Sequence, residues 1–385
     1  MTERLYFDWN ASAPLRDEAR GAVLRALGLT GNASSVHAEG RAARGMIEAA
    51  RGEVAQLVGA EAKNVTFTSG ATEANMLALT SAIETAGEKR KRDKLLISAI
   101  EHPSVLCGGR FETSAVEQIA VDRDGIVDLE ALRIALAASE RPLVSVMLAN
   151  NETGVVQPIR AVADLVHAAG GLLHVDAVQA PGRIDCTQET LGADLMTLSS
   201  HKIGGPQGAG ALIRRGDLYI TDALIKGGGQ ERGFRSGTEN VAAIAGFGAA
   251  AAAAAHQVDP AHMARLRARL EIGLREVAPD TAIFGEGALR LPNTTLFAAP
   301  GIKAETALIA FDLEGVAVSS GSACSSGKVQ SSHVLAAMGV SPALARGAIR
   351  LSIGWNTTML HVEQFLGTWR KLAASLLKER RGIAA

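Results

Sequence analysis

The chain has 385 residues, and its 39 lysines and arginines nearly balance 40 aspartates and glutamates, so the formal net charge is −1. Charges of both signs are scattered, and even the densest basic cluster, Lys89–Arg92, is typical of a solvated helix end, so binding to a nucleic acid is not expected. Met1–Leu5 lacks a signal-peptide core, and the longest apolar run, Val241–Ala255, is too short to cross a bilayer, so neither export nor membrane insertion is expected.

The first two thirds of the chain alternate between helical and strand patterns. Apolar positions recur at helical spacing in Glu18–Leu27 and Gly40–Val58. The expected strands that follow are Val65–Thr68, Leu95–Ser98, Val116–Val121, Leu143–Leu148, Leu172–Asp176, Leu195–Leu198 and Gly210–Ile213. The expected helices among them span Thr72 to about Ala86, about Asp128 to Ala138, and Ile159–Ala169. This alternation predicts a mostly parallel α/β sheet.

The pattern changes after the glycine-rich loop Gly227–Glu231. Residues 242 to about 278 are helical almost throughout, with a break at Asp259-Pro260. Beyond them we expect strands at Thr294–Phe297, Val316–Ser319 and Ala348–Ile353, and helices at Thr306–Leu313, Ser332–Met338 and His361–Lys378. Because 385 residues can bury two cores, we expect a large α/β domain, residues 15–255, and a smaller α+β domain formed by residues 1–14 and 256–385.

Three polar features follow expected strands and suggest one cofactor. Lys202 comes just after the strand Leu195–Leu198 and before a glycine-rich loop, which is a plausible setting for a Schiff-base lysine. Asp176, at another strand end, can keep a pyridinium nitrogen protonated. The turn through Gly70 into a helix at Thr72 offers free N–H groups to a phosphate. Together these features indicate pyridoxal 5′-phosphate (PLP).

A resemblance to a known family covers almost the whole chain. The matching motifs are Tyr6–Pro14, Asn32–His37, Thr68–Glu73, Glu101–Val105, Ala149–Gly154, His174–Gln179, Ser200–Lys202, Arg232–Asn240 and Ser319–Cys324. In this order they resemble the class V aminotransferase-fold enzymes, and within them the cysteine desulfurases of the NifS and IscS type. The resemblance implies the PLP-dependent transferase fold, which is that of aspartate aminotransferase.

The resemblance also implies roles around the cofactor. Lys202 carries it and removes the substrate's Cα proton, Asp176 pairs with the ring nitrogen, and His102 stacks on the ring and shuttles protons. Gln179 donates to the ring's 3-oxygen, and Asn150 lines the cofactor and the substrate. The positions that match phosphate contacts are Ala71, Thr72, Ser199 and His201, joined by Thr238 from the neighbouring subunit. A homodimer with shared sites is therefore expected.

Two further residues concern the substrate. Arg350 lies inside an apolar strand, where a guanidinium needs a partner; the alternatives are an internal salt bridge and a fork for the substrate's α-carboxylate, and the resemblance implies the second. Cys324 lies among small and polar residues, where it can be either a small buried side chain or a reactive thiol. The resemblance implies a thiolate that takes sulfur from L-cysteine as a persulfide.

We therefore expect a PLP-dependent cysteine desulfurase that makes L-alanine and passes sulfur to an acceptor protein, an iron–sulfur scaffold above all. The chain lacks the longer tail with which IscS-like members engage that scaffold, so the pathway stays open. No resident metal is expected, although Cys324 can transiently ligate an iron–sulfur cluster with a scaffold. The three cysteines, far apart and without a CxxC motif, favour a reduced, cytoplasmic setting. The alternatives are a selenocysteine lyase or true aminotransferase, and a sulfur-relay protein with a vestigial cofactor site.

Overall fold

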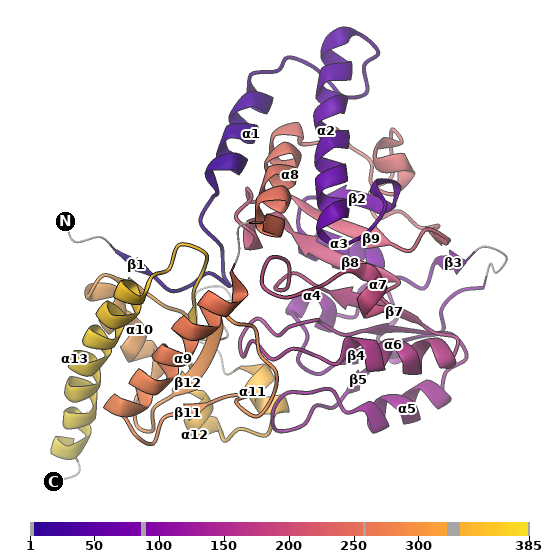
Figure 1. Cartoon of the computed structure of the whole chain (residues 1–385). Helices are drawn as coiled ribbons and strands as arrows, with labels where there is room; N and C mark the ends of the chain where they lie inside the picture. The colour runs from indigo at the N-terminus through magenta and orange to yellow at the C-terminus, as the bar shows by residue number, and fades with distance from the viewer. Residues whose placement is uncertain (1–3, 86–89, 257–258, 322–331, 384–385) are drawn as a thin grey trace.

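The structure, a computed structural model, describes residues 4–85, 90–256, 259–321 and 332–383 and is built around a seven-stranded sheet (Figure 1). In spatial order the strands are β2 (Val65–Thr68), β9 (Gly210–Arg214), β8 (Leu195–Ser199), β7 (Leu172–Asp176), β6 (Pro142–Ser145), β4 (Lys94–Ser98) and β5 (Val116–Ile119). The strands from β8 to β5 are parallel, whereas β9 runs antiparallel to both β8 and β2. The predicted mostly parallel sheet is confirmed.

Helices cover this sheet on both faces, so β7 and β8 are buried along their whole length. The helices connecting the strands are α3 (Ala71–Ala78), α4 (Pro103–Leu106), α5 (Leu129–Ala137), α6 (Ile159–Ala168) and α7 (Gln188–Leu191). At one end of the molecule α8 (Val241–His256) packs between α1 (Asp17–Leu27) and α2 (Ala38–Leu57), as Figure 1 shows. The small side chains of α8, mostly alanine and glycine, allow this close packing.

The predicted helix from Thr72 to about Ala86 is wrong in its length, because α3 ends at Ala78. Two of its last carbonyl groups, those of Met76 and Leu77, accept hydrogen bonds from the Arg110 guanidinium at 3.1 Å. Beyond the helix, the segment β3 (Ile83–Thr85) pairs antiparallel with β10 (Leu218–Ile220). A tertiary contact therefore ends the helix, and strand pairing uses the residues that follow.

The second part of the molecule is an antiparallel three-stranded sheet with helices packed against it. The sheet has the order β11 (Ala282–Ile283), β12 (Thr294–Ala298) and β14 (Ile349–Ser352). The helices are α9 (Pro260–Val277), α10 (Ala304–Leu313), α11 (His333–Ala337), α12 (Pro342–Ala345) and α13 (Met359–Ile383). The N-terminal strand β1 (Leu5–Tyr6) joins this part by pairing with β13 (Val316–Ala317).

Two large apolar clusters underlie this arrangement. One contains buried residues from Ala19 to Ala254 beneath the seven-stranded sheet, and the other joins Phe7 to buried residues between Met263 and Ala373. In the second cluster Phe311 stacks on Phe365 and on Trp369. The clusters support the division into residues 15–255 and the two flanking segments, which stays a prediction.

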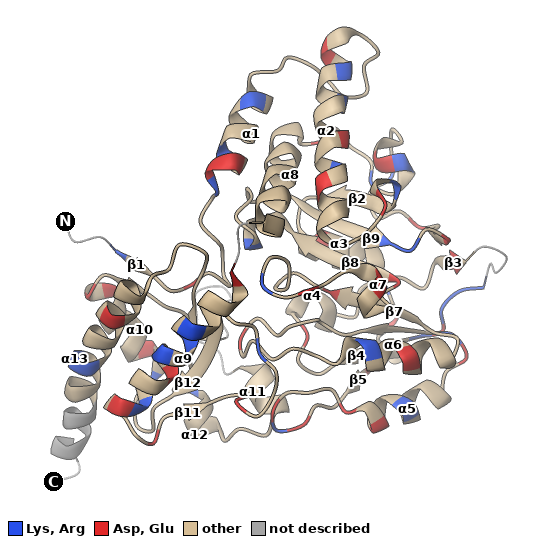
Figure 2. Cartoon of the chain, in the orientation of Figure 1, with Lys and Arg blue, Asp and Glu red and all other residues tan. Residues whose placement is uncertain are grey.

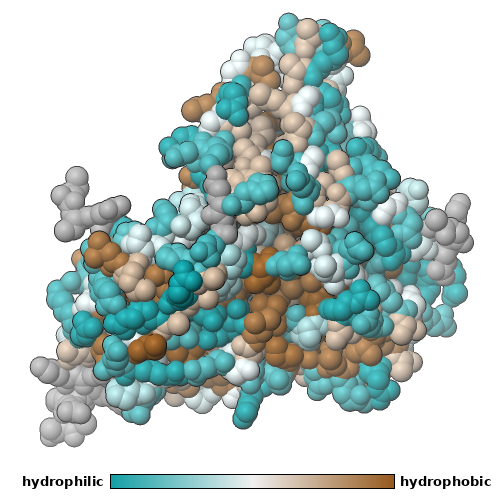
Figure 3. All heavy atoms as spheres, in the orientation of Figure 1, coloured by the Kyte–Doolittle hydropathy of each residue, from teal (hydrophilic) through white to brown (hydrophobic). Residues whose placement is uncertain are grey.

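The surface carries charges of both signs on most outer helices, as Figure 2 shows. In the view of Figure 3 apolar side chains gather in the middle of the face. Within the described residues no single helix is long and apolar enough to span a membrane. Helices α8 and α9 pass that test only as a pair, and the chain bends by 80° between them.

Candidate active site

A cavity of about 530 Å³ lies where the carboxyl ends of β4, β7 and β8 meet the start of α3. This is the edge at which open α/β sheets bind ligands, and the volume is typical of a small-molecule site. The residues that the sequence predicted and that line this cavity are Ala71, Thr72, His102, Asp176, Gln179, Ser199, His201, Lys202 and Arg350. The fold thus brings together side chains from both ends of the sequence.

Lys202 enters the cavity from the short turn that follows β8. Its Nζ donates hydrogen bonds to the carbonyl oxygens of Asn10 (2.6 Å) and Ala11 (2.9 Å). These acceptors belong to the N-terminal segment, which therefore crosses the cavity beside the amine. The two bonds hold the amine at a defined place in the cavity wall, as a reactive lysine requires.

Asp176 is the last residue of β7 and is only 6% exposed. Its Oδ2 accepts a hydrogen bond from Asn75 Nδ2 (2.9 Å), and its Oδ1 accepts one from the backbone N–H of Val178 (3.1 Å). The two donors fix the orientation of both oxygens of this buried carboxyl group. The carboxylate is thus held rigidly and can pair with a cationic ring nitrogen.

The start of α3 forms the other end of the cavity. Its N-cap residue, Gly70, has no side chain with which to occupy the N–H groups of the first turn. The neighbouring strand passes very close here, since a Cβ added at Gly210 would lie 2.5 Å from the Gly70 carbonyl carbon. Gly210 also pairs with Ser199 and with Thr68 across the sheet. A helix N-terminus in this setting suits a phosphate group.

Two histidines in the cavity are held in their neutral forms. Burial lowers the pKa of His102, and its Nδ1 accepts a hydrogen bond from the backbone N–H of Ser104 (3.2 Å), which places the ring proton on Nε2. Burial and the nearby charge of Lys202 lower the pKa of His201 to about 4. Neutral His102 can therefore donate a hydrogen bond from Nε2. If the ring takes up a second proton, its lowered pKa favours giving that proton up again.

Asn10 is the centre of a hydrogen-bond network beside Lys202. Its carbonyl oxygen also accepts from Gln179 Nε2 (3.1 Å), while its Oδ1 accepts from Arg183 Nη1 (3.0 Å). The same Arg183 nitrogen donates to Gln179 Oε1 (2.5 Å). An amide nitrogen carries two hydrogens, so Gln179 keeps one for a bound ligand.

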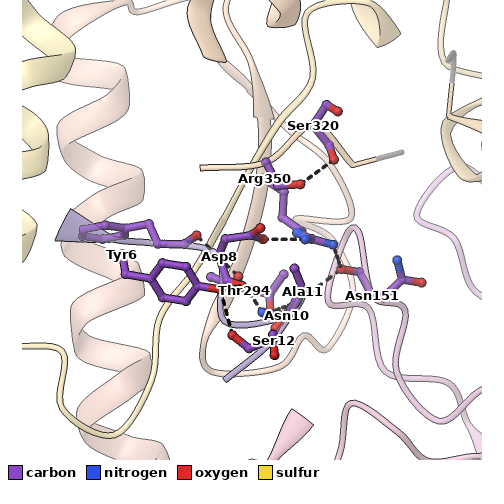
Figure 4. A network of polar contacts seen from close by, with 12 residues as sticks. Tyr6, Asp8, Asn10, Ala11, Ser12, Asn151, Thr294, Ser320 and Arg350 are labelled. Atoms are coloured by element: carbon purple, nitrogen blue, oxygen red, sulfur yellow. Dashed lines mark hydrogen bonds and ion pairs between the residues drawn. The ribbon is translucent and has the colours of Figure 1, made fainter. Parts of the chain in front are cut away.

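Arg350 lies in β14 and is 2% exposed. Figure 4 shows its side chain beside Asp8 and Asn151. Its Nη2 donates to Asp8 Oδ1 (2.7 Å), and its Nη1 donates to the carbonyl oxygen of Asn151 (2.9 Å). Its Nε is buried and makes no hydrogen bond within the described residues. The salt bridge thus anchors the guanidinium of Arg350, and the residue still forms part of the cavity wall.

Three predicted residues are not placed in the cavity wall. Asn150 is fully buried, and its Oδ1 accepts from the backbone N–H groups of Glu152 and Thr153, so it shapes the adjoining turn. Thr238 lines a separate cavity of about 180 Å³, which shares Ser69 with the main one. Cys324 lies outside the described residues.

Sequence reasoning missed the residues that hold the site together. Asp8 and Asn10 lie inside the motif Tyr6–Pro14, but nothing local shows that their partners are distant in the chain. Asn75 follows Ala71 by four positions, which places both on one face of α3 and could have indicated a shared site. Only the folded chain shows that Asn75 holds Asp176.

The residues present fit the predicted cofactor, PLP. The site joins a lysine amine, a doubly hydrogen-bonded carboxylate and an uncapped helix start in one cavity. Those are the partners of an aldehyde, a pyridinium nitrogen and a phosphate. Among the described residues no three His, Cys, Asp or Glu side chains are grouped as a metal ion would require.

Comparisons with known proteins agree over nearly the full length. The chain matches the family described as aminotransferase class-V over residues 5–365. A cysteine desulfurase of Cereibacter sphaeroides is 43% identical over 371 residues, covering 94% of each chain. The cysteine desulfurase IscS of Dictyoglomus turgidum is 39% identical over 365 residues, 93% of this chain and 91% of the relative. Among solved structures, a NifS-like protein from Rickettsia africae aligns with a TM-score of 0.87 at 36% identity, covering 96% of this chain and 99% of that chain.

Proposed function

The chain belongs to the aminotransferase class-V family, within the cysteine desulfurases of the NifS and IscS type, and on this premise we propose that it uses PLP to convert L-cysteine to L-alanine. The fold predicted from the sequence, that of the PLP-dependent transferases, is confirmed. One observation carries the proposal: Lys202, Asp176, the start of α3 and Arg350 share one cavity.

The chain's own residues would hold PLP at three points. Lys202 would bind its aldehyde carbon, Asp176 would pair with its ring nitrogen, and the first turn of α3, at Ala71 and Thr72, would take its phosphate. When bound, PLP supplies an electron sink for the pair left behind when Cα loses a proton. Asn75 matters to this function because it fixes the carboxylate of Asp176.

Arg350 and Lys202 act on the amino-acid part of the substrate. Arg350 lines the cavity and would bind the α-carboxylate, and the bonds to Asp8 and Asn151 keep its guanidinium in place. This anchoring sets which substituent of Cα faces Lys202, whose amine takes the Cα proton. His102, neutral and with its proton on Nε2, is available to hold and return a proton beside it.

Cys324 carries the sulfur chemistry in this proposal. Its thiolate sulfur forms a bond to the substrate's sulfur while the substrate's Cβ–S bond breaks. Cβ gains a hydrogen and the sulfur is oxidised to the sulfane level, so L-cysteine and one thiol become L-alanine and one persulfide. No external oxidant is needed, because the reduction of carbon balances the oxidation of sulfur.

The persulfide then passes its outer sulfur to a protein acceptor, for which we propose an iron–sulfur scaffold. The names of relatives such as IscS support sulfur transfer of this kind. The homodimer with Thr238 donated across subunits, the role of Asn150 beside the substrate and the cytoplasmic location also stay predictions.

The experiment that tests the function is intact-protein mass spectrometry of PLP-loaded enzyme after brief exposure to L-cysteine without reductant. We expect added sulfur of about 32 Da that a thiol removes, together with L-alanine in solution. The Cys324→Ala variant should lack the added mass and lose alanine formation.

A matched control is Cys107→Ala, since Cys107 is an exposed free cysteine outside the cavity wall and its loss should change neither product. If Cys324→Ala kept full alanine and sulfide output, the sulfur step assigned to this thiol would be wrong. If neither product formed with the unaltered enzyme, the proposed activity itself would fail.

A further inference from the structure

Arg183 is a buried cation that the proposed mechanism does not use. It is 7% exposed and does not line the cavity wall. Burial, together with the nearby charge of Arg350, lowers its pKa to about 9, so it stays a cation at pH 7. Within the described part of the chain its guanidinium donates only to uncharged oxygens. These are Asn10 Oδ1 (3.0 Å), Gln179 Oε1 (2.5 Å) and the backbone carbonyl oxygens of Gln179 (3.2 Å) and Lys202 (3.4 Å).

These contacts fix which way the side-chain amide of Gln179 is turned. A guanidinium only donates hydrogen bonds, so the atom of Gln179 that faces Arg183 is the acceptor Oε1. At the other end of the amide, the backbone carbonyl of Asn10 only accepts, so the atom that faces it is Nε2 (3.1 Å). Turning the amide over would set donor against donor and acceptor against acceptor. Gln179 lines the cavity, and its Nε2 keeps one hydrogen for a ligand there.

The amide nitrogen lies beside the amine of Lys202. Both donate to one oxygen, because the carbonyl oxygen of Asn10 also accepts from Lys202 Nζ (2.6 Å). In PLP the 3-oxygen is on the ring carbon next to the one that carries the aldehyde. A ring bound to Lys202 through its aldehyde carbon would therefore have the 3-oxygen as its nearest polar atom to this amide. That oxygen carries negative charge, which a cation buried behind the amide stabilises.

We propose that Arg183 is a positioning residue that occupies Oε1 of Gln179 and thereby keeps the amide N–H turned toward the cavity, where it would bind the 3-oxygen of PLP. This inference rests on the proposed function, because it takes PLP as the ligand. Gln179 contacts the ring, whereas Arg183 acts through Gln179. A buried charge without a counter-charge costs free energy, and this role explains why the chain retains one here.

The test compares two ligands that differ in the 3-oxygen alone. PLP and 3-deoxypyridoxal 5′-phosphate share the aldehyde, the ring nitrogen and the phosphate, and absorbance titration of the cofactor-free protein gives the affinity for each. For Arg183→Met we expect PLP binding to weaken by about tenfold and binding of the 3-deoxy compound to stay within about twofold of the unaltered protein. The intrinsic difference between the two ligands is the same in both proteins and cancels. A general loosening of the site would weaken both ligands alike.

The conservative variant Arg183→Lys keeps a cation that only donates, so it should bind PLP within about threefold of the unaltered protein. The matched control is Arg214→Met. Arg214 is also 7% exposed and lies outside the cavity wall, and it donates to the backbone carbonyl of Leu218 (2.8 Å). Its loss should change neither affinity. If Arg183→Met does not fold, Arg183→Gln takes its place, because an amide can donate or accept and no longer fixes the orientation of Gln179.

A double variant tests whether Arg183 acts through Gln179. In a Gln179→Ala protein the further change Arg183→Met should weaken PLP binding by no more than about twofold, since there is no amide left to orient. A tenfold loss in that protein would overturn the proposal. So would an equal loss of both ligands in Arg183→Met alone, or an unchanged affinity for PLP.

Failure of the proposed function gives a different result. If the unaltered protein binds PLP but makes no L-alanine from L-cysteine, the proposed activity fails, while the two affinities still decide the role of Arg183. If the unaltered protein binds no PLP, both proposals are wrong. A failure of the Arg183 proposal alone appears only in the variants and leaves alanine formation by the unaltered enzyme as it is.

Discussion

Glu101 is a fully buried carboxyl group next to His102 in the chain. Its Oε1 accepts hydrogen bonds from Ser98 Oγ (2.5 Å) and from the N–H of Met147 (2.7 Å), whereas its Oε2 has no partner within the described residues. Burial, only partly offset by these bonds, raises the pKa of Glu101 to about 8. The neutral acid is therefore the stable form in the folded protein at pH 7.

The raised pKa of Glu101 predicts that the stability of the folded protein depends on pH. In the unfolded chain Glu101 loses its proton near pH 4.5, so its contribution to stability is fully present below that pH and is lost as the pH rises to about 8. A raised pKa corresponds to about 1.4 kcal/mol per unit. Glu101→Gln, which mimics the neutral acid, should match the unaltered protein near pH 5 and gain roughly 2–4 kcal/mol relative to it by pH 8.5.

Urea unfolding of both proteins at the two pH values measures this difference. Other titrating groups, such as His174 with its pKa lowered to about 4 by burial, are the same in both proteins and cancel in the comparison. Parallel pH profiles for the two proteins would show that Glu101 is ionised in the folded state.

At the scale of elements, the phosphate end of the cavity depends on how closely β9 approaches the start of α3. A Cβ at position 210 would lie 2.5 Å from the carbonyl carbon and 2.7 Å from the Cα of Gly70, and 2.8 Å from the nitrogen of Ala71. These are backbone atoms, which cannot turn aside as a flexible side chain does. The strand and the helix start must therefore separate to accommodate any other residue.

Gly210→Ala should therefore weaken PLP binding by about tenfold or more and destabilise the protein by about 1–3 kcal/mol. Absorbance titration with PLP and urea unfolding measure the two effects. Gly52→Ala is the matched control: a Cβ there meets nothing within 4 Å on α2, so it should leave PLP binding unchanged and stabilise the helix by up to about 1 kcal/mol. Unchanged PLP affinity in Gly210→Ala would contradict the phosphate assignment at α3.

At the scale of the whole molecule, the position of Thr238 is relevant to the proposed homodimer. It lines a smaller cavity that shares Ser69 and Gly208 with the main cavity, but it does not line the main cavity of its own chain. The segment before it is firmly attached, since Arg51 and Glu231 form a buried ion pair (2.6 Å) and Glu231 accepts from the N–H of Phe67. Large apolar side chains such as Val36 (88% exposed) and Leu27 (68% exposed) lie on the surface, where a partner subunit can cover them.

We therefore expect twice the chain mass of 39.9 kDa in sedimentation equilibrium at micromolar concentration. Thr238→Val should keep that mass and weaken PLP binding by about tenfold, the cost of one hydrogen bond to a charged group. Absorbance titration measures the affinity. A fully active monomer would contradict both the shared site and the role of Thr238.

By itself the sequence determined the parallel sheet and the chemical groups of the site. The β-branched strand runs and helical periodicities are local patterns, so strands such as Leu172–Asp176 were predicted without any tertiary information. The same holds for Lys202 and Asp176, because strand ends are readable from the sequence and carboxyl ends of parallel strands share one edge. The family resemblance added the roles of Arg350, His102 and Cys324, which no local pattern determines.

Only the tertiary structure decided what holds those groups in place. Asn75 and Asp176 are 101 positions apart, and Asp8 and Arg350 are 342 apart, so no periodicity relates them. The end of α3 at Ala78 was set by the Arg110 guanidinium, and the contacts of Glu152 with Gly321 and Ser332 arise from segments that meet only on folding. Such contacts depend on the geometry of the packed chain, and local propensity carries no information about it.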